Sequence, residues 1–114
     1  MAQIDALFRE MKERGASDLH MVIGFPPLLR MRGDLVPTQH PVLTPESNRD
    51  ILYEILSAEQ QSHLEKNRDL DLAYEVAQLA RFRCNFLHQQ RGLGAVFRII
   101  PTDIMTVEQL GLPA

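Results

Sequence analysis

Three arginines in the last third of the chain have the chemistry and the spacing to bind an anion. Arg81 and Arg83 alternate with apolar residues over 80–86, and Arg98 does the same over 93–99. This alternation predicts two strands with one buried face and the arginines on the other. The planar guanidinium group suits two-point contact with a phosphate or a carboxylate. The sequence therefore indicates a cationic patch on the outward face of a hairpin.

The register expected for this hairpin places Arg81 opposite Arg98, with Arg83 one step along the same face. It follows from a loop of two or four residues around Gln89-Gln90, which keeps the apolar residues on one face. The apolar pairs across the hairpin are then Phe86 with Leu93, Cys84 with Ala95, and Phe82 with Phe97.

Like charges directly opposite each other destabilise a sheet, so an anion lying across the arginines would explain the patch. In the other interpretation, the arginines pair with acids of the preceding strand, Glu75 or Asp71. Spacing alone leaves both interpretations open.

Asp18 and His20 lie two residues apart on the outward face of an earlier strand, as part of a metal or acid–base site could. A metal site needs further ligands, so we expect a structural or interdomain role here and no metal. Cys84 and His88 share a strand face, but hydrolytic chemistry also needs an orienting group and an oxyanion site. We therefore predict no catalytic residue, and we expect Cys84 to pack inward.

The elements that must position these residues follow from periodicity, turn residues and capping residues. Helices are predicted over 3–14, from Thr44-Pro45 to about 56, from Ser57 to about 66, and in a short segment at 106–109. Strands are predicted over 17–23, on both sides of Arg32-Gly33-Asp34, and over 69–76, 80–86 and 93–99. This order predicts an α+β fold, with an antiparallel sheet and helices packed on one face. The 114 residues suit a single domain, 1–114.

Composition restricts the function classes. The formal net charge is −3 and the basic residues form no run, which argues against nucleic acid as a partner. We expect neither a signal peptide nor a membrane-spanning segment, because no apolar stretch approaches the roughly 18 residues required. The chain's one cysteine cannot form an internal disulfide and fits a reducing, cytoplasmic location.

Several motifs, in order, resemble one family. Gly15-Ala16-Ser17-Asp18-Leu19-His20, then Gly24-x-Pro26-Pro27-x-x-Arg30-x-x-Gly33, is similar to the opening of type IV pilus retraction ATPases of the PilT type. The second half is similar in Ala80-Arg81-Phe82-Arg83-Cys84-Asn85, in Gln90-Arg91-Gly92-x-Gly94-Ala95-Val96-Phe97-Arg98-x-Ile100-Pro101, and in Leu110-Gly111-Leu112. Together the motifs cover essentially the whole chain.

This resemblance implies the PAS-like N-terminal domain of a cytoplasmic, hexameric motor of the secretion ATPase superfamily. The parent would bind ATP with Mg in a RecA-like domain and act on a pilus platform at the inner membrane, without inserting into the membrane itself. The chain has no Gly-x-x-x-x-Gly-Lys-Ser/Thr motif, so it lacks the loop that cradles phosphates and is expected to hydrolyse nothing alone.

The resemblance also assigns roles to individual residues. It implies that Arg81, Arg83 and Arg98 reach the nucleotide phosphates across the cleft between domains, with Arg83 and Arg98 as the leading pair. We assign Asp18, His20 and Arg30 to contacts between domains or with the neighbouring subunit's ATPase domain. The alternative function is a free-standing PAS-like sensor that binds a small ligand in its core.

Overall fold

The computed structural model describes residues 3–100 and contains three helices and six strands within that range. The helices are α1 (Ile4–Arg14), α2 (Pro45–Tyr53) and α3 (Ala58–Asn67). The strands are β1 (Asp18–Met21), β2 (Leu28–Met31), β3 (Asp34–Pro37), β4 (Asp69–Val76), β5 (Ala80–Gln89) and β6 (Gly92–Ile100). These elements agree with the predicted order, and the short helix predicted at 106–109 lies outside the described residues.

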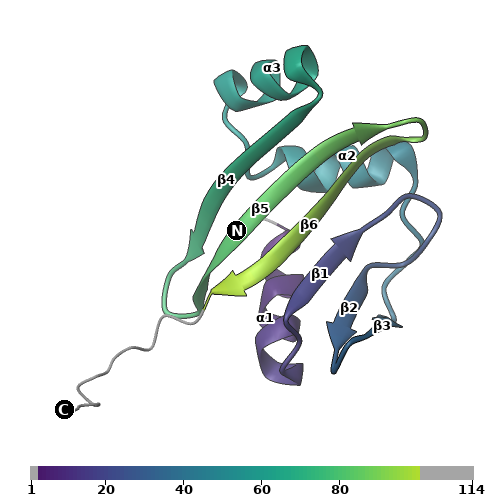
Figure 1. Cartoon of the computed structure of the whole chain (residues 1–114), viewed down its shortest axis with the longest axis vertical. Coiled ribbons are helices and arrows are strands. Elements are labelled where there is room, and N and C mark those ends of the chain that lie inside the picture. Colours follow the sequence, from purple (N-terminus) through teal and green to yellow (C-terminus); the bar gives the residue numbers. More distant parts are fainter. Residues whose placement is uncertain (1–2, 101–114) are drawn as a thin grey trace.

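All six strands form one antiparallel sheet in the order β3-β2-β1-β6-β5-β4 (Figure 1). The chain therefore contributes two meanders, β1–β3 and β4–β6, which join where β1 pairs with β6. This junction brings residues about 80 positions apart into direct contact. It places Asp18 beside Arg98 at the centre of the sheet.

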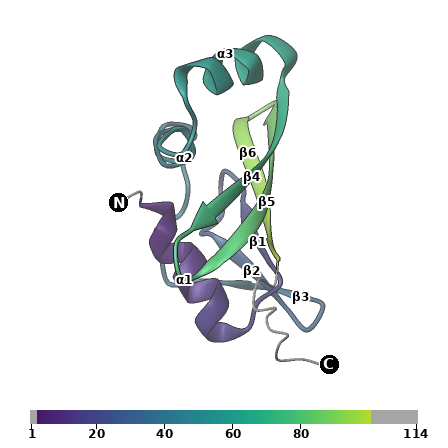
Figure 2. The same ribbon diagram turned by 90° about the vertical axis from the view of Figure 1, so that its left-hand side faces the viewer.

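The helices leave one face of the sheet open. Helices α1 and α2 lie on the same side of the sheet, and α3 lies near the start of β4 (Figures 1 and 2). This confirms the predicted α+β fold with helices packed on one face. Each helix has local end signals: Gly15 ends α1 at φ 74°, while Thr44 and Ser57 open α2 and α3 as capping boxes. No helix within residues 3–100 combines the length and apolarity needed to cross a bilayer.

The space between the helices and the sheet is filled with aromatic side chains. Phe8 of α1 stacks on Phe82 at 4.1 Å between ring centroids and meets Phe97 edge-on at 5.1 Å. Phe86 meets Phe97 edge-on at 5.7 Å from the other side. Cys84 is buried among these residues as predicted, and burial raises the pKa of its thiol to about 12.

The predicted hairpin register was wrong by two residues. Arg83, rather than Arg81, lies opposite Arg98, and the hairpin turns through Gln90 and Arg91. A shift of two residues keeps every side chain on its predicted face, so apolar alternation could not distinguish the two registers. Gly92 follows the turn at φ 134°, where a Cβ would come within 2.9 Å of the Ile23 side chain.

A partly buried hydrogen bond ties α1 to the edge of the sheet and leads to a stability prediction. The Tyr74 hydroxyl donates to Asp5 Oδ1 at 3.1 Å, and Asp5 is buried. Burial, together with this carboxylate, raises the pKa of Tyr74 to about 12. Tyr74→Phe removes the donor and leaves a buried carboxylate without it, so we expect a loss of about 1–3 kcal/mol in the free energy of unfolding.

Urea denaturation at pH 7 measures this loss. Tyr53→Phe is the matched control, because the Tyr53 hydroxyl donates to Glu65 in an exposed setting. Equal stabilities for the two variants would show that the Asp5 contact contributes nothing of its own.

Candidate functional site

A row of charged residues crosses the middle of the open sheet face. The register pairs Arg30 of β2 with Asp18 of β1, Asp18 with Arg98 of β6, and Arg98 with Arg83 of β5. Four adjacent strands thus each contribute one charged residue to the row. The structure thus places Arg83 and Arg98, which were predicted to contact phosphate, in one row with Asp18 and Arg30. The latter two were predicted to contact another domain or subunit.

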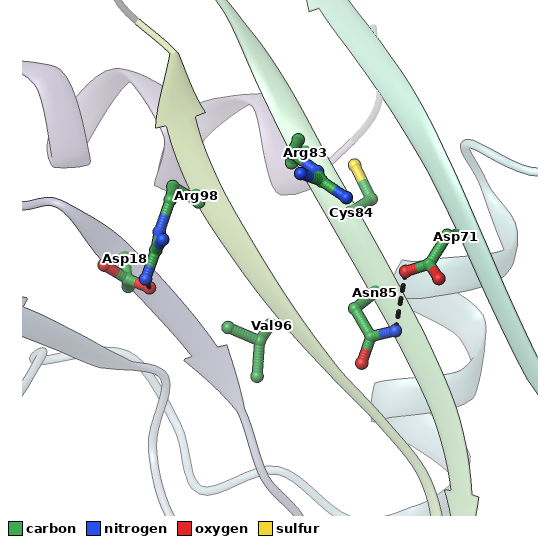
Figure 3. A pocket seen from close by; sticks show the side chains of 7 residues that line it. All are labelled: Asp18, Asp71, Arg83, Cys84, Asn85, Val96 and Arg98. Atoms are coloured by element: carbon green, nitrogen blue, oxygen red, sulfur yellow. Dashed lines mark hydrogen bonds and ion pairs between the residues drawn. The ribbon is translucent and has the colours of Figure 1, made fainter.

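A depression of about 240 Å³ lies over the β1, β6, β5 and β4 part of this face (Figure 3). Figure 3 shows Arg98 extending toward Asp18 on β1, while Arg83 lies over β5, on the side away from Asp18. Seven residues line the depression: Asp18, Asp71, Arg83, Cys84, Asn85, Val96 and Arg98. Both leading arginines therefore reach one solvent-accessible hollow, and their charged groups diverge rather than clash.

The acid that pairs with this patch is not one that the sequence suggested. Arg98 Nη2 lies 3.4 Å from Asp18 Oδ2. The Arg98 side chain is 70% exposed, whereas that of Asp18 is only 7% exposed. Asp71 instead accepts a hydrogen bond from Asn85 Nδ2 at 2.7 Å. In residues 3–100, the ion pair found for the three arginines is thus the one between Arg98 and Asp18.

Arg81 lies apart from this hollow. It is exposed on the open face, but it pairs across the strands with Ile100 and with Glu75. Because the register differs from the predicted one by two residues, Arg81 does not face Arg98. Arg83 and Arg98 remain the pair that the geometry brings together.

His20 and Arg30 lie on the β1–β2 side of the row. His20 is half-buried between Leu28 and Val96, and its Nε2 is a buried nitrogen without a hydrogen-bond partner. Burial lowers the pKa of His20, the positive charge of Arg30 lowers it further, and Asp18 opposes both effects. Arg30 donates from Nη1 to the Gly33 carbonyl at 2.9 Å. Within residues 3–100, no group of three His, Cys, Asp or Glu side chains could hold a metal ion.

The lowered pKa of His20 predicts acid sensitivity. The unfolded chain binds a proton near pH 6.5, whereas the folded chain binds it only at lower pH. Protonation therefore favours the unfolded state, and stability is lost as the pH falls from about 6.5 through the lowered folded-state pKa. We expect His20→Gln to flatten the fall in thermal midpoint between pH 7 and 5. An unchanged slope of the thermal midpoint against pH in this variant would contradict the prediction. Some slope should remain, because burial also lowers the pKa of His88.

Sequence reasoning missed Asn85 as a lining residue and Asp18 as the partner of Arg98. Asn85 was detectable, because it alternates with Cys84 and Phe86 and must share the outward face with Arg83. The contact between Asp18 and Arg98 could not be detected from the sequence, because it depends on the pairing of β1 with β6. No local pattern specifies that pairing.

The fold and this face define a small α+β unit with two arginines at a hollow on the open face of its sheet. Cys84 is among the lining residues, but it is buried and burial raises the pKa of its thiol to about 12. The hollow therefore offers cations and hydrogen-bonding groups rather than a reactive nucleophile. This chemistry suits binding and electrostatic stabilisation of an anion.

Comparisons with known proteins agree on one family, although no protein-family model matches the chain. The chain is 40% identical over 100 residues to the type IV pilus retraction ATPase PilT of Pseudomonas aeruginosa, covering 88% of this chain and 29% of that protein. It is 32% identical over 111 residues to the type IV pilus ATPase PilU of the same organism, covering 97% and 29%.

Solved structures give the same result. The crystal structure of the pilus retraction motor PilT with bound ADP superposes with a TM-score of 0.81 at 32% identity, covering 99% of this chain and 33% of that chain. The Legionella pneumophila ATPase DotB has the same fold, with a TM-score of 0.74 at 22% identity over 96% of this chain and 31% of its own. The chain is thus related to the pilus retraction ATPases of type IV pili and corresponds to their N-terminal domain. It spans about three tenths of the length of these relatives.

Proposed function

We propose that residues 1–114 form a single non-catalytic domain of a hexameric type IV pilus retraction motor. The domain closes over ATP that is bound by a RecA-like ATPase domain, and it contacts the ATPase domain of the neighbouring subunit. The relatives supply the context, since they are described as ATPases of the type IV pilus and one was solved with ADP.

The observation that carries this proposal is the pairing of Arg83 with Arg98 over an accessible hollow. Like charges at directly opposite strand positions destabilise a sheet, and here the two guanidinium groups turn apart and leave the hollow open between them (Figure 3). Asp18 pairs with Arg98 on the side of β6 that is away from Arg83. Arg83 and the space between the two arginines therefore remain available to a further anion. Phosphate oxygens suit this arrangement, because each arginine can donate through its planar fork.

The residues present fit part of a nucleotide site. Arg83 and Arg98 would contact the phosphates, and when bound, ATP with Mg would supply the hydrolysable phosphoanhydride. The rest of the site must come from elsewhere, because the chain has no glycine-rich Gly-Lys-Ser/Thr loop. We therefore assign phosphate binding to this chain and hydrolysis to the ATPase domain. The PAS-like description, the cytoplasmic location and the contact of the whole motor with an inner-membrane platform belong to this same proposal.

Titration of the purified chain with inorganic triphosphate and with Mg-ATP tests the proposal directly. We expect triphosphate to shift the side-chain Nε–Hε NMR signals of Arg83 and Arg98, with weaker binding at high salt. We expect no phosphate release from ATP. Signals that do not move up to millimolar triphosphate, or sustained hydrolysis in an Arg83→Ala variant, would contradict the assignment.

One observation favours the sensor alternative. An apolar recess of about 580 Å³ lies between α1, the 40–44 loop and α2, away from the arginines. A sensor of the PAS-like kind would use a cavity in its core, but here Phe8, Phe82, Phe86 and Phe97 pack there in mutual contact. A small ligand that shifts the signals of Leu7 and Leu43 instead of the arginine signals would favour the sensor.

A further inference from the structure

The most deeply buried charged residue of the open sheet face is the one nearest to Arg98. Asp18 has a side-chain exposure of 7%, although it shares the open face of the sheet with Arg98 (Figure 3). A carboxylate that is removed from water this far is costly unless a charged or hydrogen-bonding partner compensates it. The partner within reach is Arg98, whose Nη2 lies 3.4 Å from Asp18 Oδ2.

The contact restrains the Arg98 side chain and leaves most of its N–H donors available. A guanidinium group carries five N–H donors, and this ion pair involves a single terminal nitrogen. The side chain stays 70% exposed and, like Arg83, it lines the hollow. A free arginine side chain loses rotamer entropy when it is fixed on a ligand. A partner that fixes it beforehand removes part of that cost from binding.

We propose that Asp18 is a positioning residue, which holds the Arg98 guanidinium over the hollow so that its free edge meets a phosphate group. This inference rests on the proposed phosphate contact of Arg83 and Arg98. It changes the role of Asp18 from a contact between domains or subunits to a support for the anion site within the same sheet.

Simple electrostatics predicts that neutralising Asp18 strengthens anion binding, whereas loss of a positioning residue weakens it. This difference makes the proposal testable. Asp18 and Asp71 both place a carboxylate at the hollow, so neutralising either one raises the local positive potential and should strengthen anion binding. Among residues 3–100, Asp71 accepts a hydrogen bond from Asn85 and pairs with no arginine, so Asp71→Asn reports the change in local potential. If Asp18 positions Arg98, Asp18→Asn instead weakens binding despite the loss of a negative charge.

The experiment measures the dissociation constant of inorganic triphosphate for the wild-type chain and for four variants. These are Asp18→Asn, Asp71→Asn, Arg98→Ala and the double variant Asp18→Asn/Arg98→Ala. We expect Asp18→Asn to weaken binding about three- to tenfold, Asp71→Asn to leave it unchanged or tighter, and Asp18→Asn to have less than about a twofold effect once Arg98 is alanine. A backbone NMR spectrum verifies that each variant is folded, and Asp18→Ser replaces Asp18→Asn if the buried amide unfolds the chain.

Two results would overturn the proposal. Tighter binding in both aspartate variants would mean that Asp18 competes with the anion for Arg98. Equal weakening by Asp18→Asn with and without Arg98 would mean that Asp18 acts through the fold alone.

A second measurement separates this inference from the proposed function. The heteronuclear NOE of the Arg98 Nε–Hε group reports side-chain order without any anion. We expect an ordered group in the wild type and a mobile one in Asp18→Asn. If triphosphate does not bind the wild type, the proposed function fails, and the NOE alone then decides whether Asp18 orders Arg98. An unchanged NOE in the variant rejects the positioning role.

Discussion

Replacing Arg83 or Arg98 by alanine in the full-length ATPase that we propose is expected to lower ATP turnover about tenfold or more while leaving the domain folded. Both side chains lie on the open face, so their truncation removes no core volume. Arg98→Ala also removes the partner of the buried Asp18 carboxylate, so a backbone NMR spectrum of this variant must verify that the domain is folded. An arginine that reaches a transferring phosphoryl group stabilises charge that develops in the transition state, and this contribution can exceed a factor of ten. The effect should therefore appear mainly in kcat.

Lysine at the same positions is expected to restore only part of the activity. A lysine preserves the charge, but its ammonium group cannot reproduce the planar fork of donors. Steady-state turnover by the assembled hexamer measures all four variants, with assembly verified by light scattering. Full turnover in both alanine variants would mean that the arginines only form a solvated surface.

Arg81→Ala is the matched control on the same strand. Arg81 is also an exposed arginine of β5, two residues from Arg83, but it does not line the hollow. We expect a smaller loss of turnover for this variant than for Arg83→Ala. A loss as large as that of Arg83→Ala would indicate that the phosphate contact extends toward the Arg81 end of the strand.

The sheet faces could be predicted from the sequence because side-chain alternation has a period of two. Ala80, Phe82, Cys84 and Phe86 are all buried, and the residues between them are all exposed. An error of two residues in the hairpin register changes no face, so the outward position of Arg83 and Arg98 was correct although their predicted pairing was not. The turn position determines the pairing, and glycine, glutamine and arginine around 89–92 allowed more than one turn.

The composition of the site could not be predicted in the same way, because it depends on contacts between distant parts of the chain. Strand β1 follows α1 in sequence and yet lies between β2 and β6. Only this arrangement makes Asp18 a neighbour of Arg98 and buries its carboxylate. Asn48 is a similar case: it is fully buried in α2 and donates to the carbonyls of Met21 and Leu93, which joins α2 to both sheet halves.

Phe8→Ala is expected to have the largest effect on stability, a loss of about 3–5 kcal/mol in the free energy of unfolding. Phe8 is fully buried and joins α1 to the sheet through its contacts with Phe82, Phe97 and Tyr74. Alanine leaves a cavity at the point where these three rings meet, and close-packed neighbours relax only partly into such a space. A domain of this size has a total stability of about 5–15 kcal/mol, so this loss removes a fifth or more of the total.

Urea denaturation distinguishes this effect from a general intolerance of phenylalanine loss. The control is Phe25→Ala, because Phe25 is 49% exposed and its truncation should change stability by no more than about 0.5 kcal/mol. Phe8→Leu should recover most of the loss, since leucine fills more of the cavity than alanine does. The unfolding midpoint should fall in Phe8→Ala with an unchanged slope, as expected for a lost core contact in a two-state transition. A loss below about 1 kcal/mol would mean that α1 is not fixed to the sheet by this aromatic cluster, and that the sheet is stabilised chiefly by its own strand pairing.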